Sequence, residues 1–97
     1  MRTIKNLISN EKRVYIFMRD RATRFRFMSD AEREGITYFD HSSPTEQMIS
    51  DIVSLNPDNT ICFVGAMGRT CFQCNPPYIV RIDYEKYVNG NDNYMFR

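Results

Sequence analysis

Short apolar, β-prone runs, separated by charged or turn-forming residues, predict that much of this chain forms β-strands. They lie at residues 14–18, 36–39, 52–55, 60–64 and 78–84. The segment 56–59 (Asn-Pro-Asp-Asn) has proline at its second and asparagine at its fourth position, which suits a four-residue hairpin loop. The last run alternates, and one of its faces is expected to be core: Tyr78, Val80, Ile82 and Tyr84 lie on one face, Ile79, Arg81 and Asp83 on the other.

Two helices are predicted between these strands. The first begins after Asp20, a capping residue, and ends at Gly35, which is placed to adopt a left-handed conformation. Its apolar positions recur every three residues, at Ala22, Phe25, Met28 and Ala31. Phe27 lies outside this stripe, and a widened apolar face is favoured over an anchor for a partner. A short second helix is expected to start at 43–46, which has a serine cap, a proline at the first helical position and a glutamate three residues after the cap.

The order strand, helix, strand, short helix, hairpin, strand predicts an α+β fold. We expect a mainly antiparallel sheet of about four or five strands, packed on one main helix and one short helix, and a single domain over residues 1–97. A polar turn at 89–93 is followed by three large apolar residues, Tyr94, Met95 and Phe96. This end of the chain is expected to dock on its own core or on a neighbouring subunit.

The overall charge indicates neither a nucleic acid nor a membrane surface as the partner. Thirteen lysines and arginines stand against 12 aspartates and glutamates, a formal net charge of +1. Basic residues are nevertheless concentrated near the N-terminus, at Lys12, Arg13, Arg19, Arg21, Arg24 and Arg26. A solvated face that pairs with the acidic segment 31–60 is favoured over a binding surface for a polyanion, and the sequence leaves both open.

The compartment is expected to be the cytoplasm. Residues 1–10 lack the apolar run of a signal peptide, and no stretch of the sequence is long and apolar enough for a membrane span. The three cysteines make an odd count without a secretory context, which favours reduced thiols over a disulfide framework.

Catalysis, a metal and a cofactor are not expected. Cys71 and Cys74 have the spacing of zinc and redox motifs but stand alone, because Cys62 and His41 do not form a second pair of ligands. A single histidine in a serine-rich acidic loop is more often a solvated residue than a catalytic base. The carboxylates do not form an evident acid and base pair either.

The segment 65–70 (Gly-Ala-Met-Gly-Arg-Thr) offers the best candidate binding site. Glycines after a buried strand let backbone N–H groups approach an anion, and an arginine stands beside them. A tight turn needs the same glycines and is the favoured alternative, since the spacing of a P-loop is absent. Six residues are the candidate ligand-binding residues: Gly65, Gly68, Arg69, Phe72, Asn75 and Arg81. Arg69 and Arg81 would bind phosphate and Phe72 would stack on a base.

Three segments carry a resemblance to known proteins. They are 30–35 (Asp-Ala-Glu-Arg-Glu-Gly), 59–65 (Asn-Thr-Ile-Cys-Phe-Val-Gly) and 81–87 (Arg-Ile-Asp-Tyr-Glu-Lys-Tyr). With these segments the chain resembles small uncharacterised proteins of Gram-positive bacteria and their phages. More weakly, it resembles the phage-encoded Thoeris anti-defence sponges of the first type, which implies an oligomer that sequesters a cyclic ADP-ribose signal without degrading it. The candidate residues above rest on their chemistry and not on this resemblance.

Two functions follow as expectations. The first is a non-catalytic protein that binds and sequesters a phosphorylated nucleotide signal, with sites completed between the subunits of a homo-oligomer. The alternative is an inhibitor that binds a bacterial defence nuclease or another host protein through arginines and exposed aromatic side chains.

Overall fold

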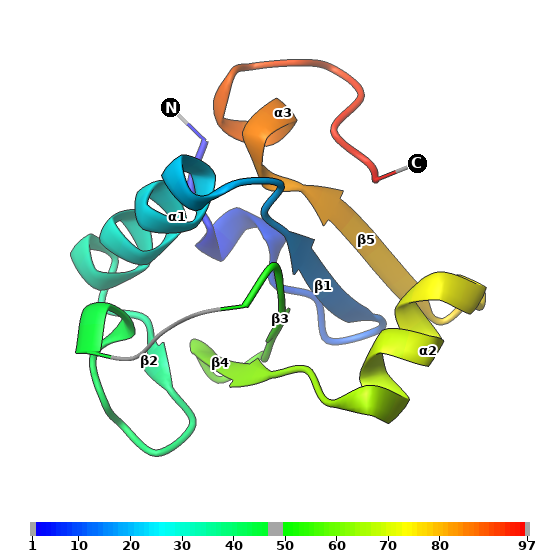
Figure 1. Ribbon diagram of the computed structural model, residues 1–97, viewed down its shortest axis with the longest axis horizontal. Helices are drawn as coiled ribbons and strands as arrows, with labels where there is room; N and C mark the ends of the chain where they lie inside the picture. The colour runs from blue at the N-terminus through cyan, green and yellow to red at the C-terminus, as the bar shows by residue number, and fades with distance from the viewer. Residues whose placement is uncertain (1, 47–49, 97) are drawn as a thin grey trace.

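The computed structural model describes residues 2–46 and 50–96, within which the chain forms five strands and three α-helices (Figure 1). The strands are β1 (Arg13–Phe17), β2 (Thr37–Tyr38), β3 (Ile52–Leu55), β4 (Thr60–Phe63) and β5 (Ile79–Asp83). The α-helices are α1 (Arg21–Arg33), α2 (Ala66–Cys74) and α3 (Tyr84–Val88). Two short 3-10 helices span Lys5–Leu7 and Pro44–Glu46. The second of these stands where the sequence predicts a short helix, whose continuation over 47–49 lies outside the described residues.

The five strands form one mixed sheet in the order β2-β4-β3-β1-β5. The predicted hairpin is confirmed, since β3 and β4 are antiparallel with Val53 opposite Phe63 and Leu55 opposite Ile61. β1 is antiparallel to β3 but parallel to β5, and β2 is parallel to β4. The α+β class is thereby confirmed, and the mainly antiparallel sheet is corrected to a mixed one. Parallel pairs join strands that are distant in sequence and have no tight turn between them, so no local sequence pattern predicts them.

The boundaries of α1 are predicted well, and its buried face is predicted in part. The Asp20 carboxylate accepts a hydrogen bond from the backbone N–H of Thr23 at 2.8 Å, and Gly35 ends the helix at φ +78°. Phe25 is 60% exposed, whereas Phe27 is fully buried and packs in the core with Met28 and Ala31. A strict three-residue spacing drifts around a helix of 3.6 residues per turn, so only part of the predicted stripe faces the sheet.

Both faces of the sheet are covered, by different helices (Figure 1). In β1, Val14 and Ile16 belong to the larger core cluster beneath α1 and α3, while Tyr15 belongs to a smaller cluster with Phe72 of α2. This alternation follows from the pleat of a strand, which points successive side chains to opposite faces. Helix α2 covers only part of its side of the sheet, and a hollow lies over the part that it leaves open.

The last predicted strand is shorter than expected and leads directly into α3. β5 ends at Asp83, whose carboxylate accepts a hydrogen bond from the backbone N–H of Lys86 and so caps the new helix, which begins at Tyr84. Tyr78 lies outside the strand and is 62% exposed, and Ile79 is buried on the α2 face. The prediction of a single core face for 78–84 is therefore corrected to a strand with two covered faces.

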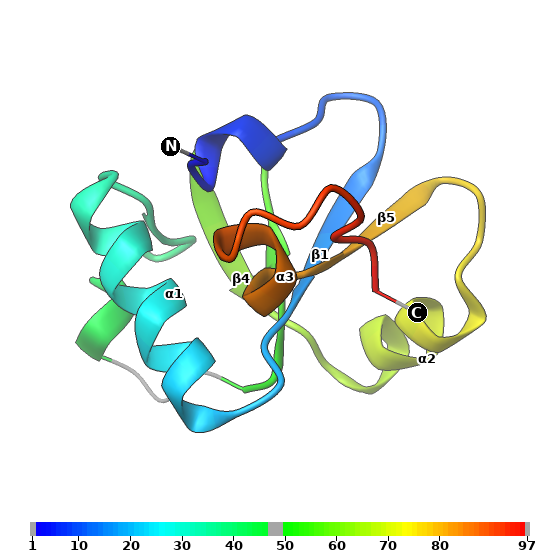
Figure 2. The same cartoon turned by 90° about the horizontal axis from the view of Figure 1, so that it is seen from above.

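The C-terminal segment docks on the chain's own core (Figure 2). Asp83 donates its backbone N–H to Tyr94 O at 2.8 Å, and Phe96 donates its own to Arg81 O at 2.9 Å. The ring of Phe96 lies 4.6 Å from that of Phe17 and 4.9 Å from that of Phe72. Of the two docking alternatives, contact with the chain's own core is confirmed.

Candidate functional site

The glycine-rich segment is the start of a helix and not a loop. Gly65 is the N-cap of α2 and lacks a side-chain cap, and Gly68 lies within the first turns of the helix. A Cβ at Gly68 would stand 2.7 Å from a methyl carbon of Val64, so this position requires a residue without a side chain or a shift of that valine. Both glycines line the same hollow.

The other predicted site residues are used elsewhere in the structure. Arg69 forms an ion pair with Asp51, with both side chains partly exposed. Phe72 is 4% exposed and belongs to the smaller core cluster. Its ring is therefore core, and not the free stacking surface that the sequence predicts.

Arg81 and Asn75 also form contacts that stabilise the fold. One terminal nitrogen of the Arg81 guanidinium donates to Phe72 O at 3.1 Å, and the group lies 5.2 Å from the ring centres of both Phe72 and Phe96. Arg81 thus joins α2 to the C-terminal segment. Asn75 is the C-cap of α2 in the left-handed conformation, with φ 50°. Of the six predicted residues, only Gly65 and Gly68 line the hollow, whereas Phe72 and Arg81 contact each other within the packed part of the fold.

The hollow beside these glycines has a volume of about 310 Å³ and lies over the part of the sheet that α2 leaves uncovered. It is lined by Arg13, Tyr15, Ser54, Asn56, Cys62, Phe63, Val64, Gly65 and Gly68. A neighbouring hollow of about 530 Å³ shares Arg13, Ser54 and Asn56 with it and extends to Tyr78. We call the two together the Arg13 groove. The smaller hollow is at the lower end of the size range of ligand pockets.

The electrostatics of the smaller hollow favour an anion. Arg13 is its only charged lining residue and has no acidic partner within the described part of the chain. Hydrogen bonding with the Tyr15 hydroxyl raises the pKa of Arg13 above its ordinary value. Gly65 places the N-terminus of the nine-residue helix α2 at the same hollow without a side-chain cap. The first N–H groups of a helix carry partial positive charge, which adds to that of the arginine.

One exposed aromatic side chain, Tyr78, stands along the Arg13 groove, whereas the register of β3 and β4 turns the Phe63 ring to the other face of the sheet. Phe63 is 45% exposed and stacks on Tyr38 with ring centres 4.9 Å apart. Tyr78 is 62% exposed, and its hydroxyl lies 3.8 Å from the Cys71 sulfur, a hydrogen bond that raises the pKa of the Tyr78 hydroxyl. The Tyr78 ring therefore retains surface in the groove on which a planar ring can stack.

The polar wall of the groove is held by a small hydrogen-bond network. The Asn56 amide donates to Thr60 Oγ1 at 2.9 Å and to the Cys62 sulfur at 3.0 Å. Asn56 is fixed in turn by the hairpin, where its N–H donates to Thr60 O at 2.8 Å. The groove therefore has a rigid floor built on β3 and β4.

Other chemical features are sparse in the described residues. Within residues 2–46 and 50–96, no group of three or more histidine, cysteine, aspartate or glutamate side chains is placed to hold a metal ion. His41 lies in an exposed loop with φ 70°, and Cys62, Cys71 and Cys74 are free thiols. No helix in this part of the chain has the length and apolar character needed to cross a membrane.

The residues that form the floor of the groove are not among those predicted from the sequence. Alternation within 13–17 already places Arg13 and Tyr15 on one face of the strand, opposite Val14 and Ile16. That signal could have located Arg13 on a sheet face. It could not show that α2 leaves this part of the face open.

Comparisons with models of protein families, with curated proteins and with solved structures found no match.

Proposed function

We propose that this protein binds and sequesters a phosphorylated nucleotide signal, such as a cyclic ADP-ribose isomer, in the Arg13 groove. The observation that carries the proposal is the hollow of about 310 Å³ whose only charged lining residue is Arg13, with the uncapped N-terminus of α2 beside it. A guanidinium and free backbone N–H groups are the donors that proteins use for phosphate. The nucleotide class rests on the exposed ring of Tyr78 and on the resemblance to anti-defence sponges.

The proposed activity is binding without chemistry. Cys62, the nucleophilic side chain of the smaller hollow, accepts a hydrogen bond from the Asn56 amide, which is not a base. A nucleophile needs an adjacent base to be activated, and this lining offers none. Sequestration in the cytoplasm of an infected bacterium requires only affinity, and the three free thiols agree with a reducing compartment.

The proposal includes assembly into a homo-oligomer. Met67, in the first turn of α2, is 88% exposed, and Tyr78 is exposed along the adjoining groove. A second copy of the chain seated on these side chains would bury apolar surface and close the open side of the groove. The ligand would then be enclosed by two subunits.

Arg13 and Arg69 provide a matched pair of variants for the test. Isothermal calorimetry of the parent protein against cyclic ADP-ribose isomers and cyclic dinucleotides should show saturable binding. Arg13→Ala should weaken it roughly tenfold to a hundredfold, because a charge-assisted contact is lost. Arg69→Ala removes the same charge from an ion pair outside the groove and should leave the affinity within a few fold. Equal losses of affinity in both variants would contradict binding of the nucleotide in the Arg13 groove.

A second candidate function, a protein inhibitor, is favoured by one observation on α1. Phe25 is 60% exposed between Arg24 and Arg26, and arginine and aromatic residues are enriched where proteins bind each other. If none of the nucleotides binds the parent protein at about 100 micromolar, a concentration that would detect even weak ligands, this candidate replaces the first. Phe25→Ser should then abolish inhibition of a purified defence nuclease while the fold is retained.

A further inference from the structure

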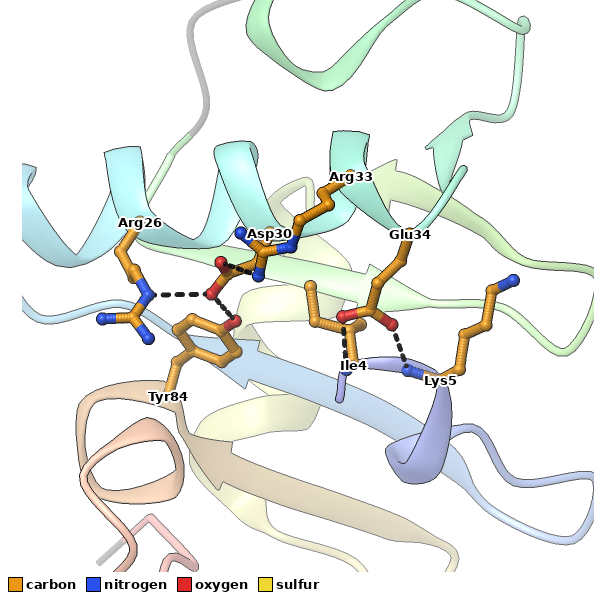
Figure 3. A network of polar contacts seen from close by, with 7 residues as sticks. All are labelled: Ile4, Lys5, Arg26, Asp30, Arg33, Glu34 and Tyr84. Atoms are coloured by element: carbon orange, nitrogen blue, oxygen red, sulfur yellow. Dashed lines mark hydrogen bonds and ion pairs between the residues drawn. The ribbon is translucent and has the colours of Figure 1, made fainter. Parts of the chain in front are cut away.

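Asp30 is a buried carboxylate that holds two arginines of α1 in fixed positions (Figure 3). It is 5% exposed and accepts hydrogen bonds from Arg26 Nε at 3.0 Å and from a terminal nitrogen of Arg33 at 2.6 Å. The Tyr84 hydroxyl donates to the same carboxylate at 2.6 Å. A buried charge is stable only when it is paired and hydrogen-bonded, so this carboxylate constrains both guanidinium groups.

Each of these arginines keeps donors that are not used within the described residues. A guanidinium has five N–H donors on three nitrogens, and Asp30 engages one nitrogen of Arg26 and one of Arg33. Both terminal nitrogens of Arg26 remain, and so do Nε and one terminal nitrogen of Arg33. The two side chains are 54% and 63% exposed, so these donors are accessible from solvent.

A third arginine is fixed nearby by the other end of the chain. Arg2 donates from one terminal nitrogen to Tyr87 O at 3.0 Å and to Asn91 O at 2.7 Å. Its guanidinium also lies 5.2 Å from the ring centre of Tyr87 and 5.0 Å from that of Tyr94. Arg2 is therefore held without an acidic partner within the described residues.

The N-terminal segment that carries Arg2 is itself anchored. The Glu34 carboxylate accepts hydrogen bonds from the backbone N–H groups of Ile4 at 2.9 Å and Lys5 at 3.0 Å (Figure 3). The Tyr87 hydroxyl donates to Thr3 O at 2.6 Å. Arginines supplied by two parts of the chain are thus placed before any ligand arrives, and such preorganisation reduces the entropy lost on binding.

These three arginines line one cleft, which we call the Asp30 cleft. It has a volume of about 430 Å³, and its remaining lining residues are Asn6, Asp30, Val88 and Gly90. Three guanidinium charges against one carboxylate leave an excess of two positive charges in the lining. A phosphate monoester carries up to two negative charges near neutral pH and a diphosphate group carries a comparable charge, and each offers several oxygens to separate guanidinium groups.

We propose that the Asp30 cleft is a binding site for the phosphate or diphosphate group of a small molecule. It lies on the α1 and α3 side of the sheet, whereas the Arg13 groove lies on the α2 side. The two sites share no lining residue, so this proposal stands independently of the proposed nucleotide function.

Inorganic pyrophosphate is the probe for the test, added to ¹⁵N-labelled protein at constant ionic strength maintained with sodium chloride. NMR titration should show saturable shifts of the Arg26 and Arg33 side-chain Nε–H signals. Arg26→Gln and Arg33→Gln should each raise the dissociation constant for pyrophosphate roughly tenfold or more. Arg21→Gln is the matched control, because Arg21 is exposed on the same helix, and it should bind as the parent does.

Arg2→Gln keeps the test decisive if Arg26→Gln or Arg33→Gln folds poorly, since it removes a charge from the cleft without removing a partner of Asp30. It should weaken pyrophosphate binding to a similar degree. Absence of saturable binding, or an equal loss in Arg21→Gln, would overturn the proposal, the latter because it indicates general charge attraction. If Arg13→Ala abolishes pyrophosphate binding while Arg26→Gln does not, the anion belongs to the groove and the cleft proposal fails.

Discussion

The arginines of this chain have quite different roles in the structure. Arg69 forms an ion pair, Arg81 joins two elements, and Arg13 faces an open hollow without an acidic partner within the described residues. An arginine is available for a ligand only when its intramolecular partners leave donors free. Those partners are 18 residues away for Arg69 and 9 and 15 residues away for Arg81.

The Asp30 carboxylate is expected to contribute strongly to stability. Asp30→Asn removes the charge that pairs with Arg26 and Arg33 and weakens the hydrogen bond from Tyr84. Because the two arginines are half exposed, we expect a loss of about 2–3 kcal/mol in the free energy of unfolding, below the value for a fully buried pair. Urea denaturation measures it, with Asp92→Asn, at an exposed position, as the control. A loss no larger than that of the control would show that the network is unimportant.

Tyr84 should make the protein sensitive to alkaline pH. Burial, with the hydrogen bond to Asp30 as a further cause, raises the pKa of the Tyr84 hydroxyl far above its ordinary value of 10.0. The unfolded chain releases this proton near pH 10 while the folded chain retains it. The contribution of Tyr84 to the free energy of unfolding is therefore complete below that pH and is lost as the pH rises.

The Tyr84→Phe variant tests this pH dependence directly. Removal of one such proton should make the fall in the free energy of unfolding above pH 10 shallower by up to about 1.4 kcal/mol per pH unit. Burial also raises the pKa values of Tyr38 and Tyr87, so some slope should remain. Urea midpoints between pH 9 and pH 11 measure the effect, and identical slopes in parent and variant would contradict it.

At the scale of elements, the structure confirms those predictions that rest on local chemistry. The cap at Asp20, the left-handed Gly35 and the turn before Thr60 each depend on a few neighbouring residues, and the sequence predicts them. Helix α3 and the whole of α2 are missed, because their sequences are also compatible with a strand or a turn. Parallel pairing of β1 with β5 depends on the packing of the whole chain and leaves no local pattern.

The C-terminal segment is expected to behave as part of the core. Phe96→Ala removes ring contacts with Phe17 and Phe72 and uncovers the Arg81 guanidinium. Since Phe96 is only partly buried, the free energy of unfolding should fall by about 1–3 kcal/mol, less than for a fully buried phenylalanine. Met95→Ala is the control within the same segment, at a residue that is 43% exposed, and should cost much less. Equal urea midpoints for both variants would mean that the segment does not stabilise the fold.

Over the whole molecule, a net charge of +1 conceals two electropositive hollows on opposite sides of the sheet. Some of the acidic groups are already paired with arginines, as Asp30 is with Arg26 and Arg33, and Asp51 is with Arg69. Composition therefore could not locate either site. The sequence identified two glycines of the groove but not its arginine, because the site depends on which part of a sheet face a distant helix leaves open.

Self-association should depend on the surface around α2 and not on the C-terminal segment. The apolar C-terminal segment contacts the core of its own chain. Met67, in contrast, remains 88% exposed beside the Arg13 groove. We expect sedimentation velocity to show an oligomer at tens of micromolar, and Met67→Lys to shift it toward monomer because a charge would be buried in the interface. Met95→Lys introduces the same charge at another exposed methionine and should leave the assembly intact. A parent protein that sediments as a monomer would exclude a groove shared between subunits, and nucleotide binding would then have to be explained by one chain alone.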